Sequence, residues 1–599
     1  MPKTQAYVTR NQRFLPYMLD ISNSGANFGV GYCQAINAVR RCDQLLEAKG
    51  QIMTRTGGEM IVEALIENGI DRVFCVPGES YLAVLDALYD TSNQIQVTVC
   101  RQEGGAANMA EAYAKLTGKP GVVLVTRGPG ATNASIGVHT GFQDSTPMIV
   151  LIGQVARDQV DREAFQEIDY RRMYGQMAKW VAEIQEPGRI PEYMSRAFQT
   201  AQAGRPGPVV LALPEDMLTE KADAPETRPV NLAKPGVSSS DVDAFRERLA
   251  RGKRPLILVG GGGWTPEATI ALTSFAETNN ISVACAFRRQ DSFDNEHPLY
   301  AGHVGIGCDP ELAKRVQSAD PLIVIGPRLG EITTGGYEML KPPYPDQSII
   351  HVHPSGEELN RVYAAELPIQ ADVTGFLQAC AAMEPLDSSA WADDAQKAHA
   401  DYMAFSDPAP IDTALDMGKV MKTIRAAVPN DTIICNGAGN YSIWVHRYYR
   451  FGKPGTQLAP TSGAMGYGVP AAVAAKLKHP ERVVISFAGD GCFQMNGQEL
   501  GTAAQYGANV IFIVVNNSMY GTIRMHQERR YKDRVVATDI KNPNFAAICE
   551  AYGGKGFIVI KTEDFADAFD QALKADSMAL IELRVDPEIV APGRRLSEL

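Results

Sequence analysis

An acid and an amide follow two successive predicted strands near the end of the chain. The segment ERVVISFAGDG (481–491) predicts a buried strand that ends at Asp490, and ANVIFIVVNN (508–517) predicts the next strand, which ends at Asn517. The segment between them has a helical pattern. In an open parallel α/β sheet, a right-handed crossover of this kind brings both strand ends to the same edge, which is where ligands bind. The sequence therefore predicts that Asp490 and Asn517 lie together at a ligand-binding edge.

The residue types at this edge suit a diphosphate and a magnesium ion. Gly489 and Gly491 flank the acid, so a diphosphate can approach the backbone, and a helix N-terminus there favours negative charge. The Asp490 carboxylate, the Asn517 amide and a carbonyl from the following loop are hard oxygen ligands, and Mg²⁺ takes about six of these. A Gly-Asp-Gly turn alone is common and usually structural. The amide 27 residues further on, at the next strand end, makes the combination more specific.

This spacing resembles the diphosphate and Mg²⁺ motif of thiamine-diphosphate enzymes. Two further segments, TSGAMGYGVPAAVAA (461–475) and CNGAGNYSIW (435–444), are similar to cofactor-binding segments of the acetolactate synthase branch of that family. Met465 by itself would more often fill a core. The resemblance implies instead that it lies between the two rings of a bent cofactor, and that the Gly463 carbonyl accepts a hydrogen bond from the 4′-amino group. The implied cofactor site consists of Asn440, Tyr441, Gly463, Met465, Gly489, Asp490, Gly491, Asn517 and Met519, and the implied Mg²⁺ ligands among them are Asp490, Asn517 and the main-chain carbonyl of Met519.

Two acids of the first block compete for a catalytic role. The string CRQEGGAANMAEAYAKLTGKPGVVLVTRGPGATNA (100–134) resembles the pyrimidine-binding domain of the same family. On that resemblance Glu111 is a structural acid, whereas Glu103, directly after the strand VTVCR, is the catalytic glutamate. A carboxylate bonded to N1′ of the aminopyrimidine favours the imino tautomer, whose 4′-nitrogen can take the C2 proton. This relay through the cofactor needs only one well-placed glutamate from the protein.

Two neighbouring segments, GFQDSTPMIVLIGQV (141–155) and REAFQEIDYRRM (162–173), are similar to family segments that line the substrate side. The resemblance implies that Phe165 and Gln166 contact the substrate.

Three positions depart from acetolactate synthase and bear on the substrates. The family tryptophan that selects a larger second 2-oxo acid falls at His526. The Ser or Gly before the GPGATN turn is Arg127, a cation that could pair with a substrate carboxylate. An Asp-Arg pair of the family's central domain falls at Glu331-Ile332. These differences argue against the branched-chain biosynthetic substrate pair.

From residue 57 onward, amphipathic helices alternate with short β-branched strands, which is the pattern of parallel α/β sheets. The predicted fold class is α/β, with three doubly wound parallel-sheet domains. Residues 112–130 can be aligned with 472–491, since each has an Ala-rich helix, a break, a β-branched strand and a Gly-rich turn. This alignment predicts that the outer two domains are a duplicated fold. The predicted segments are a poorly ordered N-terminal extension at 1–52, the pyrimidine-binding domain at 53–218, a linker at 219–240, the central nucleotide-binding-like domain at 241–383, a second linker at 384–410, the diphosphate- and Mg²⁺-binding domain at 411–585 and a C-terminal tail at 586–599.

The composition excludes several classes of protein. The 599 residues carry 57 basic and 69 acidic side chains, a net charge of −12, without a Lys/Arg block that would indicate nucleic acid binding. The longest apolar runs, at 148–152 and 510–515, are far short of the roughly 18 residues that span a membrane. The ten cysteines occur singly, which favours a reducing, cytoplasmic compartment. His351 and His353 share a predicted strand face, but no third ligand makes them a metal site.

The resemblance implies a thiamine-diphosphate-dependent carboligase of acetolactate synthase type. It would decarboxylate a 2-oxo acid such as pyruvate and transfer the acyl carbanion to a second carbonyl compound. The alternative is a decarboxylase, lyase or oxidase with another acyl donor, although the chain lacks the His-His doublet that simple decarboxylases of the family typically use. A third interpretation is a non-catalytic cofactor-binding relative. The presence of Glu103, Asp490 and Asn517 together argues against it.

The resemblance also bears on partners and on a second cofactor. In the family, the glutamate and the Mg²⁺ site of one active centre come from different subunits, which implies a homodimer or homotetramer. No segment identifies a docking surface for a regulatory subunit. The family's central domain often holds FAD, and the glycines at 260–263 are compatible with that. His353 and Ser355 stand where an acid would receive the ribose hydroxyls, which argues against FAD.

Overall fold

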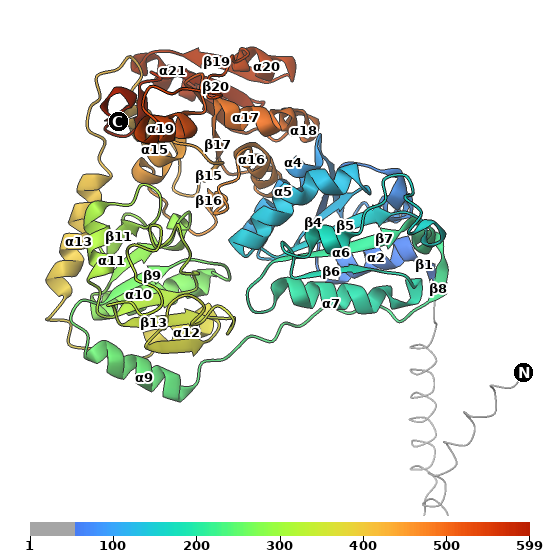
Figure 1. Cartoon of the computed structure of the whole chain (residues 1–599), viewed down its shortest axis with the longest axis horizontal. Helices are drawn as coiled ribbons and strands as arrows, with labels where there is room; N and C mark the ends of the chain where they lie inside the picture. Colours follow the sequence, from blue (N-terminus) through green and yellow to red (C-terminus); the bar gives the residue numbers. More distant parts are fainter. Residues whose placement is uncertain (1–53) are drawn as a thin grey trace, which may run out of the picture. The chain divides into compact units, whose positions relative to one another are not determined.

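The computed structural model describes residues 54–599, which contain three six-stranded sheets (Figure 1). The predicted N-terminal extension at 1–52 lies outside the described residues. Every neighbouring strand pair within the three sheets is parallel. The predicted α/β class with three parallel-sheet domains is therefore confirmed.

The first sheet is buried on both faces. Along its central strand β4, Val122 and Leu124 belong to one hydrophobic cluster and Val123 and Val125 to another, because successive side chains of a strand point to opposite faces. Burial on both faces explains why such strands are continuous apolar runs. The strands are β2 (Arg72–Cys75), β3 (Gln96–Val99), β4 (Gly121–Val125), β5 (Met148–Gln154), β6 (Trp180–Glu183) and β7 (Pro208–Pro214), in the order β3-β2-β4-β5-β7-β6, and the main helices are α2 (Gly57–Glu67), α3 (Leu82–Asp90), α4 (Glu103–Thr117), α5 (Pro129–Asp144) and α7 (Ile190–Gln202).

The third sheet repeats the topology of the first. Its order is β16-β15-β17-β18-β20-β19, so in both sheets the first strand lies between the second and the third, and the last two exchange places. This identity of topology is what a duplicated fold predicts. The strands are β15 (Ile433–Asn436), β16 (Gln457–Leu458), β17 (Val484–Gly489), β18 (Ile511–Asn516), β19 (Lys555–Val559) and β20 (Ala579–Arg584), and the helices are α14 (Met417–Ala427), α15 (Tyr441–Tyr448), α16 (Gly468–Lys478), α17 (Asp490–Asn496), α18 (Leu500–Tyr506), α19 (Gly521–Arg530), α20 (Phe545–Ala551) and α21 (Phe565–Leu573).

The central sheet has a different order, β11-β10-β9-β12-β13-β14. This is the order of dinucleotide-binding folds, in which the chain reverses direction across the sheet between the first and the fourth strand. Its strands are β9 (Leu256–Val259), β10 (Ser282–Cys285), β11 (Tyr300–His303), β12 (Leu322–Ile325), β13 (Ile349–His353) and β14 (Leu367–Gln370), with helices α9 (Ser239–Ala250), α10 (Pro266–Asn279), α11 (Pro310–Gln317) and α12 (Val373–Ala381).

The segments predicted as linkers and tail carry regular structure. The stretch 384–410 contains the 14-residue helix α13 (Ala392–Phe405), which buries only a narrow stripe of Ala395, Ala398 and Tyr402, so its composition is polar. In 219–240, β8 (Lys221–Asp223) pairs with β1 (Thr54–Thr56). In the tail, β21 (Ile589–Ala591) and β22 (Arg594–Arg595) form an antiparallel pair.

Two features of the whole described chain agree with the composition. Between residues 54 and 599, no helix combines the length and apolar character that crossing a bilayer requires. The eight cysteines of this part, from Cys75 to Cys549, are all free thiols.

Candidate functional site

A cavity of about 260 Å³ opens at the carboxyl edge of the third sheet. Its wall is made by the segments that follow β15, β17, β18 and β20, by the segment between β16 and α16, and by residues 411–417, which lead into α14. All nine residues that the sequence assigns to the cofactor line this one cavity, namely Asn440, Tyr441, Gly463, Met465, Gly489, Asp490, Gly491, Asn517 and Met519.

The register of β17 and β18 explains why the acid and the amide meet. Gly489 pairs with Val515, so the residues that follow the two strands lie side by side at the sheet edge. Asp490 begins α17, and its carboxylate accepts hydrogen bonds from the backbone N–H of Gly491 at 2.8 Å and from the Asn542 side chain at 2.7 Å. Burial raises the pKa of the Asp490 carboxyl above its usual value.

The donor set of this edge suits magnesium. In the part of the chain that the structure describes, no Lys or Arg forms an ion pair with Asp490, so a buried carboxylate faces the cavity without a cation. Asn517 and Met519 line the same wall. No group of three or more His, Cys, Asp or Glu side chains that could hold a metal occurs within 54–599. One carboxylate with an amide and a carbonyl oxygen is instead a hard donor set, which fits Mg²⁺ completed by diphosphate oxygens.

Asn542 is a site residue that the sequence analysis missed. Its amide nitrogen donates to the Asp490 carboxylate at 2.7 Å and to the Asn516 amide oxygen at 2.8 Å. Its amide oxygen accepts from the Gln494 side chain at 2.9 Å. All the hydrogen-bonding atoms of the side chain are thus used, which fixes the orientation of the Asp490 carboxylate. No local pattern identifies Asn542, because it lies 52 residues from Asp490 in the loop before α20.

Three glycines of the cavity are explained by close neighbours or by backbone conformation. A Cβ at Gly491 would lie 2.6 Å from the Tyr520 ring, and one at Gly489 would lie 3.1 Å from the Tyr441 ring. Gly463 has a φ of +71°, a conformation that favours glycine, and no neighbouring atom would obstruct a Cβ there. Gly463 is therefore required by the backbone turn, and the other two by the close approach of aromatic rings.

Further side chains of the cavity were not predicted. Trp444 from α15 and Cys492 from α17 line it, together with Val585, Ile589 and Val590 from the C-terminal segment. The residues of the C-terminal segment lie at or beyond the predicted end of the third domain. Nothing in their own sequence indicates that the chain returns to the site.

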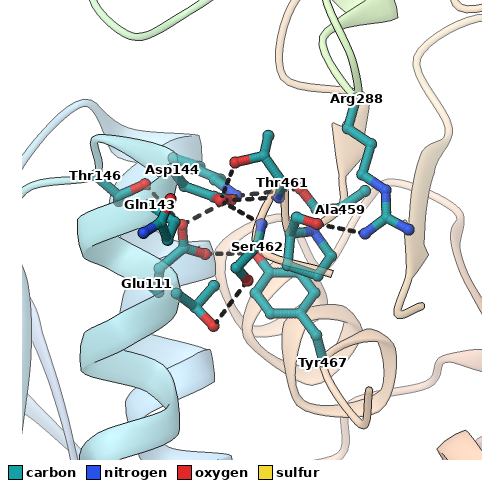
Figure 2. A network of polar contacts seen from close by, with 12 residues as sticks. Glu111, Gln143, Asp144, Thr146, Arg288, Ala459, Thr461, Ser462 and Tyr467 are labelled. Atoms are coloured by element: carbon teal, nitrogen blue, oxygen red, sulfur yellow. Dashed lines mark hydrogen bonds and ion pairs between the residues drawn. The ribbon is translucent and has the colours of Figure 1, made fainter. Parts of the chain in front are cut away.

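Glu103 and Glu111 have different environments. Glu103 is the first residue of α4, is partly exposed, and accepts a hydrogen bond from Asn133 at 2.9 Å. Glu111 is completely buried and accepts from Thr146 and from Tyr467, each at 2.6 Å (Figure 2). A bonded, buried acid of this kind has the environment of a structural residue, the role that the family resemblance implies for Glu111. Glu103 is not among the residues that line the cavity of its own chain.

Three of the four predicted substrate residues lie together, away from that cavity. The Arg127 side chain donates to the carbonyl of Phe165 at 3.2 Å, and a Cβ on Gly128 would lie 2.8 Å from Gln166. Phe165 is 72% exposed, and Gln166 has a φ of +65°. The fourth residue, His526, is exposed on α19 and does not line the cavity.

Arg127 is already engaged by protein groups. It forms ion pairs with Glu215 at 2.9 Å and with Glu79 at 3.2 Å, and it is only 7% exposed. Three of the five N–H donors of the guanidinium are thus used by the Phe165 carbonyl, Glu215 and Glu79. These contacts give Arg127 a role in holding the backbone at Phe165, and its contact with a substrate carboxylate stays a prediction.

A second cavity, of about 480 Å³, borders the central sheet. Gly261 and Gly262 after β9 and the loop after β12 line it, which is the position where dinucleotide-binding sheets hold a ligand. His353 lies at the predicted ribose position, and its Nδ1 accepts from the N–H of Ser355 at 3.0 Å. The glycines suit a nucleotide, whereas the histidine does not supply the acid that would bind ribose hydroxyls.

Three parallel sheets, two of them of identical topology, and a cavity with a diphosphate and magnesium donor set define a thiamine diphosphate-binding protein. Three family models match the chain: the N-terminal TPP binding domain of thiamine pyrophosphate enzymes over residues 55–173, their central domain over 242–380 and their C-terminal TPP binding domain over 437–583. Thiamine pyrophosphate (TPP) is the same compound as thiamine diphosphate. The chain belongs to the thiamine pyrophosphate enzyme family.

Its relatives include acetolactate synthases. The chain is 32% identical over 569 residues to the probable acetolactate synthase large subunit of Methanocaldococcus jannaschii, with 91% of this chain and 95% of that protein covered. It is 29% identical over 550 residues to the acetolactate synthase isozyme 2 large subunit of Escherichia coli, with 91% and 99% covered. It is 31% identical over 576 residues to the mitochondrial acetolactate synthase catalytic subunit of Saccharomyces cerevisiae, with 91% and 83% covered. The chain is thus a thiamine diphosphate-dependent enzyme distantly related to acetolactate synthases.

Proposed function

We propose that this enzyme is a Mg²⁺- and thiamine diphosphate-dependent carboligase that acts on 2-oxo acids. It decarboxylates a donor such as pyruvate and transfers the remaining acyl unit to a second carbonyl compound. The observation that carries this proposal is that all nine residues assigned to the cofactor from the sequence line one cavity. The relatedness to acetolactate synthases supports the choice of a carboligase.

Each group of cavity residues has a role in this proposal. Asp490, Asn517 and the Met519 carbonyl would hold Mg²⁺, and the backbone at Gly489 and Gly491 would receive the diphosphate. Gly463 and Met465 would support the thiamine rings. The bound cofactor supplies a carbon nucleophile that adds to the donor carbonyl and accepts the electron pair left when CO₂ departs.

Glu103 would be the acid–base group. Its carboxylate would share a proton with N1′ of the aminopyrimidine, which promotes proton removal from the reactive carbon. Because Glu103 does not line the cavity of its own chain, the proposal includes a homodimer, alone or within a homotetramer, in which each cavity is completed by the second copy. The proposal also includes cytoplasmic localisation, which the unpaired cysteines favour. It further includes a central domain without FAD, because His353 stands where an acid would bind the ribose hydroxyls.

Two positions that differ from acetolactate synthase bear on which substrates the proposal includes. His526 stands at the position of a family tryptophan, and Arg127 stands at that of a small residue, so the proposal does not include the branched-chain biosynthetic pair. A screen of donor and acceptor carbonyl compounds against the purified protein, with mass detection of products, identifies the pair. A hydroxyketo acid product supports ligation, whereas release of free aldehyde would identify a simple decarboxylase.

The role of Glu103 has a direct test. Glu103→Gln should lower CO₂ release from the donor by at least about 100-fold, since general acid–base groups contribute about 10² to 10⁴ in rate. Glu67→Gln, at an exposed acid of α2, serves as the matched control and should retain the wild-type rate. Full activity in Glu103→Gln, or no turnover of any 2-oxo acid by the wild-type protein with Mg²⁺ and cofactor, would contradict the proposal.

A further inference from the structure

The segment 459–467, between β16 and α16, has little structure of its own. It carries Gly463 and Met465 into the cofactor cavity, and two of its glycines, Gly463 and Gly466, have positive φ values of +71° and +81°. Among backbone contacts, the N–H of Gly463 donates to the Pro460 carbonyl at 3.1 Å, which closes only a local turn. Within the third domain, the end of the segment is held at Gly466, whose N–H donates to Cys492 Sγ at 3.1 Å and whose carbonyl accepts from Asn496 at 2.9 Å. Its first part, around Thr461 and Ser462, is held by side chains of the other domains.

Asp144 supplies most of that support from the first domain (Figure 2). Its Oδ1 accepts hydrogen bonds from the backbone N–H of Thr461 at 2.8 Å, from the Thr461 hydroxyl, and from the backbone N–H of Ser462 at 3.3 Å. Three donors of the segment thus bond to one oxygen of Asp144, whose side chain is 1% exposed. The donors belong to residues that follow Asp144 by 317 and 318 positions in the sequence.

Asp144 occupies a position that local structure does not favour. It is the last residue of α5, where the helix dipole disfavours a carboxylate, and it is buried. Lys115 offsets both costs, because its ammonium group pairs with Oδ2 of Asp144 and with Glu111 at 3.0 Å. A buried carboxylate paired on one oxygen presents the other in a fixed direction, which is the direction of Thr461.

The same network touches the segment at two further points. Lys115 donates to the carbonyl of Ala459 at 3.3 Å, and Glu111 accepts from the hydroxyl of Tyr467 at 2.6 Å. From the central domain, the buried guanidinium of Arg288 donates to the carbonyl of Pro460. The segment is therefore bound at its start, its middle and its end by charged side chains of the other two domains.

We infer that Asp144 is a positioning residue for the cofactor, which sets the place of Gly463 and Met465 by holding Thr461 and Ser462. The inference rests on thiamine diphosphate occupying the cavity, as the proposed function requires, but not on the identity of the substrates. Asp144 does not line the cofactor cavity, so its effect on the cofactor passes through the segment.

The test measures cofactor affinity in the full-length protein. Thiamine diphosphate is titrated at saturating Mg²⁺, with tryptophan fluorescence as the readout because Trp444 lines the cavity, and with calorimetry as the second method. Asp144→Asn should weaken binding by about tenfold or more, since hydrogen bonds to a charged group are replaced by weaker ones and an amide nitrogen would face Lys115. Thr461→Val should weaken binding several-fold, and Thr461→Ser, which keeps the hydroxyl, should restore it.

Thr146→Val is the matched control. Thr146 is buried and donates to Glu111 in the same network, but it does not contact the segment 459–467. The control should lower the melting temperature without changing cofactor affinity. Wild-type affinity in both Asp144→Asn and Thr461→Val would overturn the inference, and so would an equal loss of affinity in Thr146→Val. If Asp144→Asn does not fold, the Thr461 pair decides. A wild-type protein that binds the cofactor but turns over no 2-oxo acid contradicts the proposed function alone.

Discussion

The orientation of Asp490 depends on a residue that would not itself touch the metal. Asn542 bonds to Asp490 and to Asn516, the last residue of the neighbouring strand β18, so it connects the two strand ends next to the predicted ligands. Outer-shell partners of this kind typically account for 10- to 100-fold in metal affinity.

Asn542→Ala should therefore weaken Mg²⁺ binding by about 10- to 100-fold, because the Asp490 carboxylate loses the partner that orients it. The measurement is the Mg²⁺ concentration needed for half-maximal thiamine diphosphate binding. Asn544→Ala is the matched control, since Asn544 caps α20 by accepting from Ala547 at 3.0 Å and has no bond to Asp490. An unchanged Mg²⁺ requirement in Asn542→Ala would show that Asp490 is oriented without it.

Among the helices and strands, those with a strong local hydrophobic pattern could be predicted from the sequence. The strands β17 and β18 are buried apolar runs that are followed directly by Asp490 and Asn517, so the positions of these two residues at the sheet edge could be predicted from the sequence. The helix α13 was missed because only a narrow stripe of it is buried. The partners of Asp490 and Asp144 could not be predicted, because their bonds join residues 52 and 317 positions apart.

The C-terminal hairpin is the element whose removal tests the cavity wall. Deletion of residues 587–599 removes Ile589 and Val590 from the wall and the bond from Arg595 to the carbonyl of Asp412 at 2.9 Å. We expect the truncated protein to retain thiamine diphosphate less well than the full chain, since an apolar part of the wall is exposed to water. Cofactor remaining after gel filtration measures this.

Ser597→Ala is the control for the deletion, because it leaves the hairpin in place. Equal cofactor retention by the truncated and full-length proteins would mean that Ile589 and Val590 do not contribute to binding.

At the scale of the whole molecule, the proposed acid–base group and the proposed Mg²⁺ ligand lie in different domains. Asp490 lines the cavity of the third domain, and Glu103 begins a helix of the first domain outside that cavity. If each site is completed by a second copy of the chain, a dimer of two different inactive variants can contain one intact site. A site formed within one chain cannot be restored in this way.

Co-expression of Glu103→Gln with Asp490→Asn should restore activity that neither variant has alone. Random pairing makes half of the dimers mixed, and each mixed dimer has one intact site, so about a quarter of wild-type activity is expected. Activity is measured as CO₂ release at saturating cofactor and Mg²⁺. Absence of any recovery in verified mixed dimers would place both groups of one site in the same chain.

The segment that Asp144 holds lies between two cavities. Thr461 and Ser462 line the central cavity, and Gly463 and Met465 line the cofactor cavity, so the stretch 461–465 contributes to both walls. Any ligand of the central cavity that moves Thr461 changes the affinity for thiamine diphosphate. By thermodynamic linkage, the cofactor must then change the affinity for that ligand by the same factor. With thiamine diphosphate bound as proposed, the short segment would thus couple the occupancy of the two cavities.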